Sequence, residues 1–204
     1  MKFQDLQQGQ AMALAPNISF TLIRESDMAD IIQMLANPKV TEYLFFAPAP
    51  VEVYRSYFDP IIEATAVAID EQRWPENPTV VVRDQAGHFM GMGGLVQVML
   101  LEGNFEVGYQ LPEHAWGQGI ATAICQVLTE LAFTVLSAHK VTADCYSSNV
   151  GSYKTLEKCG YSVEGQSTHY YKLENGFADR LYLGLTVSEF QNKQQKVING
   201  TFKQ

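Results

Sequence analysis

The chain has 204 residues and a formal charge of −8 at pH 7, because 14 Lys and Arg residues face 22 Asp and Glu residues. Hydrophobic residues make up 47% and charged residues 18%, which excludes a chain that is mainly disordered. The acidic balance argues against nucleic acid or an anionic membrane as a partner. The opening residues are polar and rich in glutamine, and no long apolar run occurs, so we expect a cytoplasmic protein.

Three cysteines are present, Cys125, Cys145 and Cys159, and no two of them stand in a CxxC pair. An odd number of cysteines without such a pair is a poor basis for a disulfide framework or a zinc site. We therefore expect buried thiols in a reducing compartment, and we predict no metal centre.

The sequence pattern in the first half of the chain predicts a strand, then two helices, and then several strands. Residues 1–16 suggest an N-terminal extension closed by Pro16. Alternating apolar residues predict a strand over 18–23, and apolar residues at helical spacing predict a helix from Met28 to Leu35, stopped by Asn37-Pro38. The next expected elements are a helix over 51–73 that Pro60 breaks or kinks, and strands over 79–83, 88–101 and 105–111.

The second half of the chain predicts helices and strands in alternation. No internal repeat or break in composition separates the two halves, so one domain is preferred. The order of elements predicts an α/β fold of mixed layers, with a largely antiparallel sheet and helices on both faces. The expected elements are a helix over 117–137, a strand over 140–146, a helix capped by Ser148 or Asn149 and ended at Gly160, and strands over 161–173 and 177–186 joined by a turn at Glu174-Asn175-Gly176.

Glycines at the start of the long helix are the first indication of a ligand site. A strand ends at Pro112, and a short loop leads into Gly117-Gln118-Gly119 just before the apolar helix. The first amides of a helix lack partners within it and carry partial positive charge, and glycines let an anion approach. The segment predicts a cradle for a phosphate or pyrophosphate, or else a helix start that only turns the chain.

Two named phosphate motifs do not fit this segment. A Walker loop needs Lys-Ser/Thr after its last glycine, and none follows Gly119. A dinucleotide fingerprint needs a third glycine where Thr122 stands, and Gly91-x-Gly93 likewise meets Val96. A nucleotide oxidoreductase is therefore only a distant alternative.

The stretch from Gly108 to Thr122, which reads GYQLPEHAWGQGIAT, resembles the GCN5-related N-acetyltransferases, the GNAT family. The cofactor motif of that family, Arg/Gln-x-x-Gly-x-Gly/Ala, falls on the segment 116–121, where Trp116 replaces the Arg or Gln. That tryptophan is common in the branch of ribosomal-protein alanine N-terminal acetyltransferases. A second block, from Asn149 to Tyr161, is similar to the NxxSxxxLEKxGF of the same branch.

The resemblance implies a single GNAT-like domain over residues 17–190, between the extension 1–16 and a polar tail over 191–204. It implies a mixed, mostly antiparallel sheet of six to seven strands, splayed in the middle, where acetyl-CoA binds as the acetyl donor. The pyrophosphate would lie over the glycine amides, and the pantetheine arm along the end of the preceding strand. The cofactor-binding residues implied in this way are Gln110, Leu111, Trp116, Gly117, Gln118, Gly119, Ile120, Ala121, Thr122, Asn149 and Ser152.

Acetyl transfer to an amine requires a group that accepts a proton, because only the free amine attacks a thioester. Glu106 is the first candidate for this base, with a solvated strand carboxylate as the alternative, and His114 suits a surface loop better. Tyr109 would line the acetyl pocket or pack in the core. The tyrosine acid of many family members is missing, since Leu156 stands at its position, and Ser152 is the candidate to hydrogen-bond the sulfur or relay a proton.

The acceptor stays open at this point. The predicted enzyme is an acetyl-CoA-dependent N-acetyltransferase acting on a primary amine, and the branch suggests a protein N-terminal α-amine, which loses a proton more readily than lysine. Acetylation of a small polyamine or antibiotic is one alternative, and a non-catalytic CoA-binding regulatory module is another. We expect neither nucleic acid nor a membrane as a partner, and a homodimer through the C-terminal strands would be unsurprising.

Overall fold

The computed structural model describes residues 3–173 and 175–193 of the chain. These residues divide into two compact units, which are described separately below. The boundaries between the units fall inside two strands and a helix rather than in a linker. Among the described residues, the first unit contains the chain up to Val96 together with Val107–Leu128, and the second contains Gln97–Glu106 and the chain from Thr129 onward.

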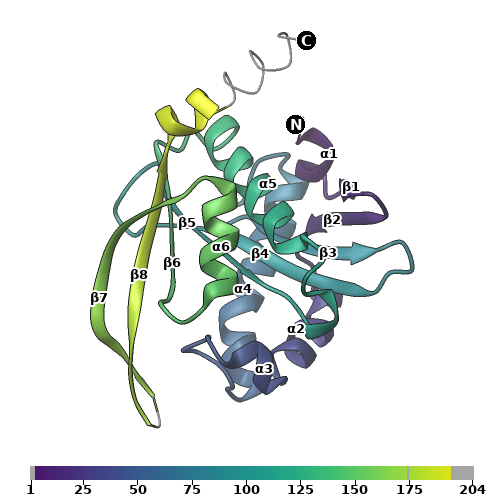
Figure 1. The fold of residues 1–204 in the computed structure, drawn as a ribbon. Helices are drawn as coiled ribbons and strands as arrows, with labels where there is room; N and C mark the ends of the chain where they lie inside the picture. The colour runs from purple at the N-terminus through teal and green to yellow at the C-terminus, as the bar shows by residue number, and fades with distance from the viewer. Residues whose placement is uncertain (1–2, 174, 194–204) are drawn as a thin grey trace. The chain divides into compact units, whose positions relative to one another are not determined.

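The sheet of the first unit is built from consecutive strands in the order β1-β2-β3-β4-β5 (Figure 1). The pairs β1–β2, β2–β3 and β3–β4 are all antiparallel. Only the C-terminal part of β5 belongs to this unit. The strands are β1 Met12–Ala15, β2 Ile18–Leu22, β3 Thr79–Asp84, β4 Phe89–Gln97 and β5 Asn104–Gln110.

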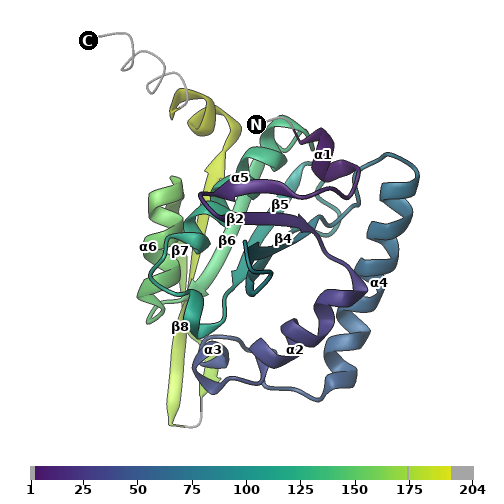
Figure 2. The same cartoon turned by 90° about the vertical axis from the view of Figure 1, so that its right-hand side faces the viewer.

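Helices cover both faces of this first sheet (Figure 2). Helices α2 and α4 pack their apolar residues in one cluster with Val81 and Met92 of the sheet. On the opposite face, a Cβ atom on Gly93 would lie only 2.4 Å from Ile124 of α5, so the close approach of this helix requires a glycine. The helices are α1 Gln4–Gln7, α2 Met28–Leu35, α3 Pro38–Thr41, α4 Val51–Asp70 and α5 Ile120–Thr134, with short 3-10 helices at Glu25–Asp27 and Glu113–Ala115.

The second unit contains the start of β5 and then the strands β6, β8 and β7 in that spatial order. Strands β7 and β8 form the long hairpin in Figure 1, and β8 is antiparallel to both β6 and β7. Strands β5 and β6 are parallel, and their ladder is short, ending at the pair Glu106–Thr142. A short ladder agrees with the expected splay. The elements are β6 Lys140–Tyr146, α6 Val150–Cys159, β7 Ser162–Leu173 and β8 Gly176–Thr186.

The structure confirms the α/β class and the mixed, mostly antiparallel sheet. Eight strands lie among the described residues, one more than the six to seven expected. The additional strand is β1, which lies within the segment 1–16 that the sequence assigns to an extension. Four residues are too few for alternation to be recognised, and β1 is fixed instead by its pairing with β2. The domain boundaries at 16 and 190 stay a prediction.

Two predicted helix features need correction. Pro60 lies inside the continuous helix α4 and does not break it, because the buried residues Phe58 and Ile62 hold the helix against the core, while the alternative of a kink stays a prediction. Helix α5 begins at Ile120 rather than at Gly117, because Gly117 and Gly119 have φ angles of 73° and 78°, outside the helical range.

The helix after β6 is confirmed in detail. The Asn149 side chain caps α6 by accepting a hydrogen bond from the amide of Ser152, and Gly160 ends the helix with a φ angle of 103°. Residue 174, in the turn expected between β7 and β8, and residues 194–204 of the expected tail lie outside the described residues.

Candidate active site

The loop between β5 and α5, residues 111–119 and here called the glycine loop, has the backbone surface that an anion requires. A Cβ atom on Gly117 or Gly119 would meet no atom within 4 Å, so the space in front of both residues is open. The carbonyl of Gly119 accepts a hydrogen bond from the amide of Ala123, which begins the helical pattern. The helical amides before Ala123 have no carbonyl one turn earlier within the helix. The loop therefore fits a pyrophosphate.

Side chains hold the glycine loop in this shape. The indole N–H of Trp116 donates to the carbonyl of Leu111 at 2.9 Å, and the Gln118 side chain donates to the carbonyl of His114 at 2.8 Å. The Nε2 atom of His114 lies 3.0 Å from the carbonyl of Phe89, and this contact orients the imidazole ring. Trp116, which stands where the resembled motif has Arg or Gln, thus holds the glycine loop against the residue that follows β5.

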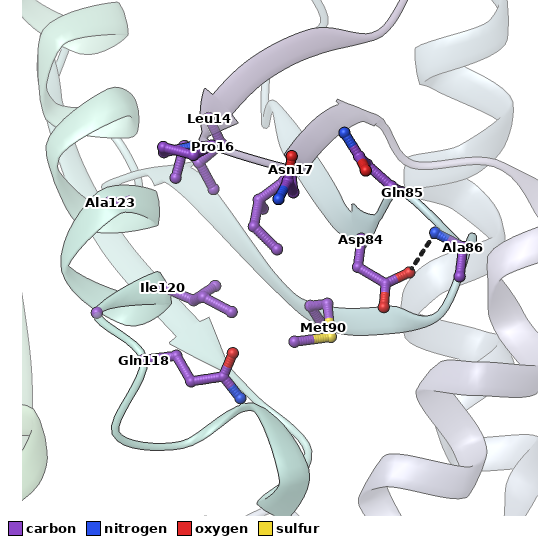
Figure 3. A pocket seen from close by; sticks show the side chains of 13 residues that line it. Leu14, Pro16, Asn17, Asp84, Gln85, Ala86, Met90, Gln118, Ile120 and Ala123 are labelled. Atoms are coloured by element: carbon purple, nitrogen blue, oxygen red, sulfur yellow. Dashed lines mark hydrogen bonds between the residues drawn. The ribbon is translucent and has the colours of Figure 1, made fainter.

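A hollow of about 540 Å³ adjoins the glycine loop in the first unit (Figure 3). Gln118, Gly119 and Ile120 belong to its lining, so it begins where α5 begins. Figure 3 shows Ile120 and Met90 on one side of this space and the β1–β2 turn, with Leu14 and its neighbours, on the other. A ligand held by the first amides of α5 therefore has a largely apolar hollow beside it.

In the second unit, strand register brings charged and aromatic side chains onto one face of the sheet. Glu106 is paired with Thr142, and Asp144 lies two residues further along β6, on the same face. Asp144 in turn is opposite Tyr182 of β8, and paired residues of neighbouring strands share a face. The side chains of this face that matter below, here called the carboxylate face, are Glu106, Asp144, Tyr146, Tyr171, Arg180 and Tyr182.

Asp144 is held by two partners on the carboxylate face. Arg180 forms an ion pair with its Oδ2 atom, and the hydroxyl of Tyr171 donates to the same oxygen at 2.9 Å. The side chains of Asp144 and Arg180 are only 18% and 21% exposed, so this ion pair is largely shielded from water. The ring of Tyr171 stacks on that of Tyr146, with centroids 3.8 Å apart, which fixes the position of its hydroxyl.

Glu106 has the electrostatic surroundings of a proton acceptor. The residue is exposed, but neighbouring protein atoms crowd its carboxyl group and reduce its solvation. This loss of solvation, and then the negative charge of Asp144, raise the pKa of Glu106, and the positive charge of Arg180 offsets only part of the effect. A carboxylate with a raised pKa holds an accepted proton better near neutral pH.

Helix α6 brings Ser152 to the opposite face of the same sheet, and Asn149 lies at the N-cap of this helix. Cys145 follows Asp144 in β6 and so points away from the carboxylate face, and the Ser152 side chain hydrogen-bonds its thiol. Burial, and then the charge of Asp144, raise the pKa of Cys145 to about 11, so its thiol stays protonated. The predicted catalytic residues Glu106 and Ser152 therefore lie on opposite faces of the second unit's sheet.

The remaining residues that the sequence predicts for the acetyl and cofactor site lie in one segment of the first unit, between residues 109 and 122. Tyr109 and Gln110 are half-buried at the end of β5, and Leu111 is buried and already holds Trp116 through its carbonyl. Ile120 is buried, while Ala121 and Thr122 are half-buried in the first turn of α5. Within the described ranges, no group of three or more His, Cys, Asp or Glu side chains is placed to hold a metal ion.

Sequence patterns alone did not indicate Asp144, Tyr171 and Arg180 as members of the candidate site. The available signal was the carboxylate of Asp144 inside the strand VTADCY, which is otherwise mostly apolar. Tyr171 and Arg180 carried no such signal, because only the register of β7 and β8 brings them to Asp144.

Comparisons with known proteins agree with this architecture. The sequence model of the family described as Acetyltransferase (GNAT) domain matches residues 17–162. A Bacillus licheniformis protein named uncharacterized N-acetyltransferase p20 is 25% identical over 168 residues, which cover 81% of this chain and 91% of that protein. The probable N-acetyltransferase YjcK of Bacillus subtilis (strain 168) is 30% identical over 79 residues, or 39% of this chain and 44% of that protein.

Solved structures share the fold. The spermidine N-acetyltransferase from Vibrio cholerae, in complex with CoA and spermine, matches with a TM-score of 0.73 and 17% identity, covering 87% of this chain and 99% of that chain. A GNAT acetyltransferase from Bacillus anthracis matches with a TM-score of 0.72 and 17% identity, covering 88% of this chain and 99% of that chain.

The fold, the open glycine loop and the family match together define an acetyl-CoA-dependent N-acetyltransferase. The chain belongs to the GNAT acetyltransferase family. Acetyl-CoA supplies the acetyl group as a thioester, and the acceptor of the family's reaction is an amine. Among the described residues, no helix is long and apolar enough to cross a membrane.

Proposed function

We propose that this protein acetylates a primary amine by direct transfer from acetyl-CoA, with Glu106 as the base. The observation that carries the proposal is the carboxyl group of Glu106, which is partly desolvated and faces Asp144. An amine is protonated at neutral pH, so its lone pair becomes available only when a proton is removed. Glu106 accepts that proton, directly or through one water molecule.

We assign the pyrophosphate and the pantetheine arm to groups of the glycine loop, the end of β5 and the first turn of α5. The amides from Gly117 to Ala121 bind the pyrophosphate, with Trp116 and Gln118 holding the loop and Thr122 adding a hydroxyl. The backbone of Gln110 and the amide of Leu111 pair with the pantetheine arm as a further strand would. Tyr109, at the end of the same strand, lines the acetyl group.

We assign the contacts near the sulfur to groups at the start of α6. The cap of α6 uses the side-chain oxygen of Asn149, so its Nδ2 atom is the group that donates to the pantetheine arm. A C–N bond forms as the C–S bond breaks, and the thiolate leaves and takes up a proton. A thiol has a pKa of about 8.5, so the thiolate leaves without a strong acid. In this proposal Glu106 acts on the amine from the carboxylate face, and the hydroxyl of Ser152 hydrogen-bonds the sulfur from the opposite face, beyond the end of the short β5–β6 ladder.

We propose a peptide N-terminal α-amine as the acceptor. Such an amine has a pKa of about 7.7–8.0, against about 10.4 for a lysine or alkyl amine, so a carboxylate removes its proton more easily. The sequence blocks shared with the ribosomal-protein N-terminal acetyltransferases support this choice. A polyamine is the second candidate, supported by the shared fold of the Vibrio cholerae enzyme that was solved with spermine.

Calorimetric titration with acetyl-CoA, followed by a thiol-release assay, tests the proposal. We expect micromolar binding that Gly119→Glu abolishes, because a carboxylate would occupy the pyrophosphate position. Short peptides with a free N-terminus should release CoA faster than N-terminally blocked peptides or spermidine. Turnover with spermidine alone would identify a polyamine, and not a peptide N-terminus, as the acceptor. Absence of acetyl-CoA binding by the folded protein would contradict the proposed function as a whole.

A further inference from the structure

The ion pair between Asp144 and Arg180 is built more rigidly than a surface ion pair. Arg180 lies over the rings of Tyr170 and Tyr182, at 4.9 Å from each centroid, and its Nη1 atom donates to the Tyr170 hydroxyl at 2.8 Å. Tyr171 fixes Asp144 from the other side through its hydroxyl. Both charges therefore keep a defined position on the sheet.

These two charges face Glu106 from two different strands. Within the second unit, Asp144 of β6 acts on Glu106 with a like charge, and Arg180 of β8 acts on it with an opposite charge. Tyr171 of β7 stays a neutral donor, because burial and then the charge of Asp144 raise its pKa. The neighbouring strand β4, Phe89–Gln97, contains no titratable residue.

We propose that Asp144 and Arg180 are positioning residues for acetyl transfer: their ion pair fixes two opposite charges beside Glu106 and so sets the pH range in which Glu106 can accept a proton. This inference rests on the proposed role of Glu106 as the base. Glu106 accepts a proton only when ionised, so activity is present above its pKa and is lost as the pH falls through it. The raised pKa places this loss at a higher pH than for an ordinary glutamate.

Neutralising one partner at a time separates this role from a structural one. Arg180→Gln and Asp144→Asn break the same ion pair, so a purely structural role predicts the same defect for both. An electrostatic role predicts opposite shifts. Without Arg180, the uncompensated charge of Asp144 moves the acidic limb of kcat/KM up by about 0.5–1 pH unit, and without Asp144 the limb moves down by a similar amount.

The experiment measures kcat/KM against pH for both single variants and for the double variant Asp144→Asn/Arg180→Gln. In the double variant the two shifts should cancel in part, so that the acidic limb of kcat/KM returns toward its wild-type position. Arg180→Lys keeps the charge and is expected to keep the wild-type limb. The matched control is the Lys140–Glu164 ion pair of the same sheet, whose Nζ and Oε1 atoms are 2.6 Å apart. Lys140→Gln removes this ion pair and is expected to leave the acidic limb of kcat/KM unchanged. Shifts of the same sign in both single variants, or no shift, would overturn the inference.

A direct titration keeps the test independent of turnover. The carboxyl carbon of Glu106 is followed by ¹³C NMR in the free protein, and Glu106→Gln assigns its signal. Opposite displacements of this titration in the two variants support the electrostatic coupling, and a common midpoint contradicts it. If the coupling is found while Glu106→Gln keeps full activity, the proposed role of Glu106 as the base is wrong. Failure of that role is therefore distinguishable from failure of the electrostatic coupling.

Discussion

The glycine loop and the carboxylate face are built in opposite ways. The glycine loop is one continuous segment of nine residues, 111–119, and the groups that we propose for binding the pyrophosphate are backbone amides. The carboxylate face takes its side chains from β5, β6, β7 and β8, and these hold one another through an ion pair, a hydrogen bond and stacked rings. One region therefore depends on backbone conformation, and the other depends on strand register.

This difference predicts where each region is sensitive to mutation. A backbone site tolerates most changes of side chain but not the loss of a glycine whose φ angle is positive. A side-chain site tolerates small backbone strain but not the removal of a charged partner, because the partner left behind stays shielded from water. The two regions should therefore fail in different measurements, binding in the first and turnover in the second.

The largest effect is expected for Glu106→Gln. The amide has nearly the same shape but cannot accept a proton, so kcat should fall by about 10²- to 10⁴-fold while the Kd of acetyl-CoA stays unchanged. Steady-state thiol release and calorimetry measure the two quantities. Glu102→Gln, in the exposed turn before β5, is the control and should change neither. Full activity of Glu106→Gln would assign the proton to another acceptor.

The second effect concerns Gly119→Ala. A left-handed φ angle costs a residue with a Cβ atom about 1–2 kcal/mol, so the loop should leave its conformation and the Kd of acetyl-CoA should rise by about 5- to 30-fold. Gly87→Ala is a matched control, because Gly87 has a φ angle of 86° and equally open surroundings, but lies in the β3–β4 turn. Equal losses of acetyl-CoA affinity in Gly119→Ala and Gly87→Ala would show that backbone strain anywhere in the unit lowers affinity, and would contradict a specific role of the glycine loop.

A smaller effect is expected for Ser152→Ala. Its hydroxyl only hydrogen-bonds the leaving sulfur under our proposal, and a thiolate leaves readily without an acid, so kcat should fall by about fivefold. Ser148→Ala, at an exposed position just before α6, is the control. A loss as large as that of Glu106→Gln would give Ser152 a more direct part in proton transfer than we assign to it.

The smallest effect is expected for Trp116→Phe. An aromatic ring is kept, but the indole N–H and its hydrogen bond to the carbonyl of Leu111 are lost, which costs about 0.5–1.5 kcal/mol of loop stability. The Kd of acetyl-CoA should rise by about threefold, with kcat unchanged. Tyr171→Phe is the complementary variant on the carboxylate face and should leave this Kd unchanged. A change of kcat alone in Trp116→Phe would contradict the assignment of this residue to binding.

Much of this protein could be predicted from local sequence patterns. The boundaries of β6 were given by its apolar residues, those of α6 by Asn149 and Gly160, and the left-handed turn before α5 by Gly117 and Gly119. Each of these signals lies within a few residues of the feature that it predicts, because capping, periodicity and left-handed turns are local properties of the chain.

Other features were decided only by the tertiary structure. Strand β1 is too short to be recognised alone and exists through its pairing with β2, while Pro60 is tolerated because neighbouring turns of α4 are buried. Asp144, Tyr171 and Arg180 meet although Asp144 and Tyr171 are 27 positions apart in the chain. Sequence determined the conformation of the glycine loop because left-handed turns are local, and register determined the carboxylate face because contacts between strands depend on how distant segments pair.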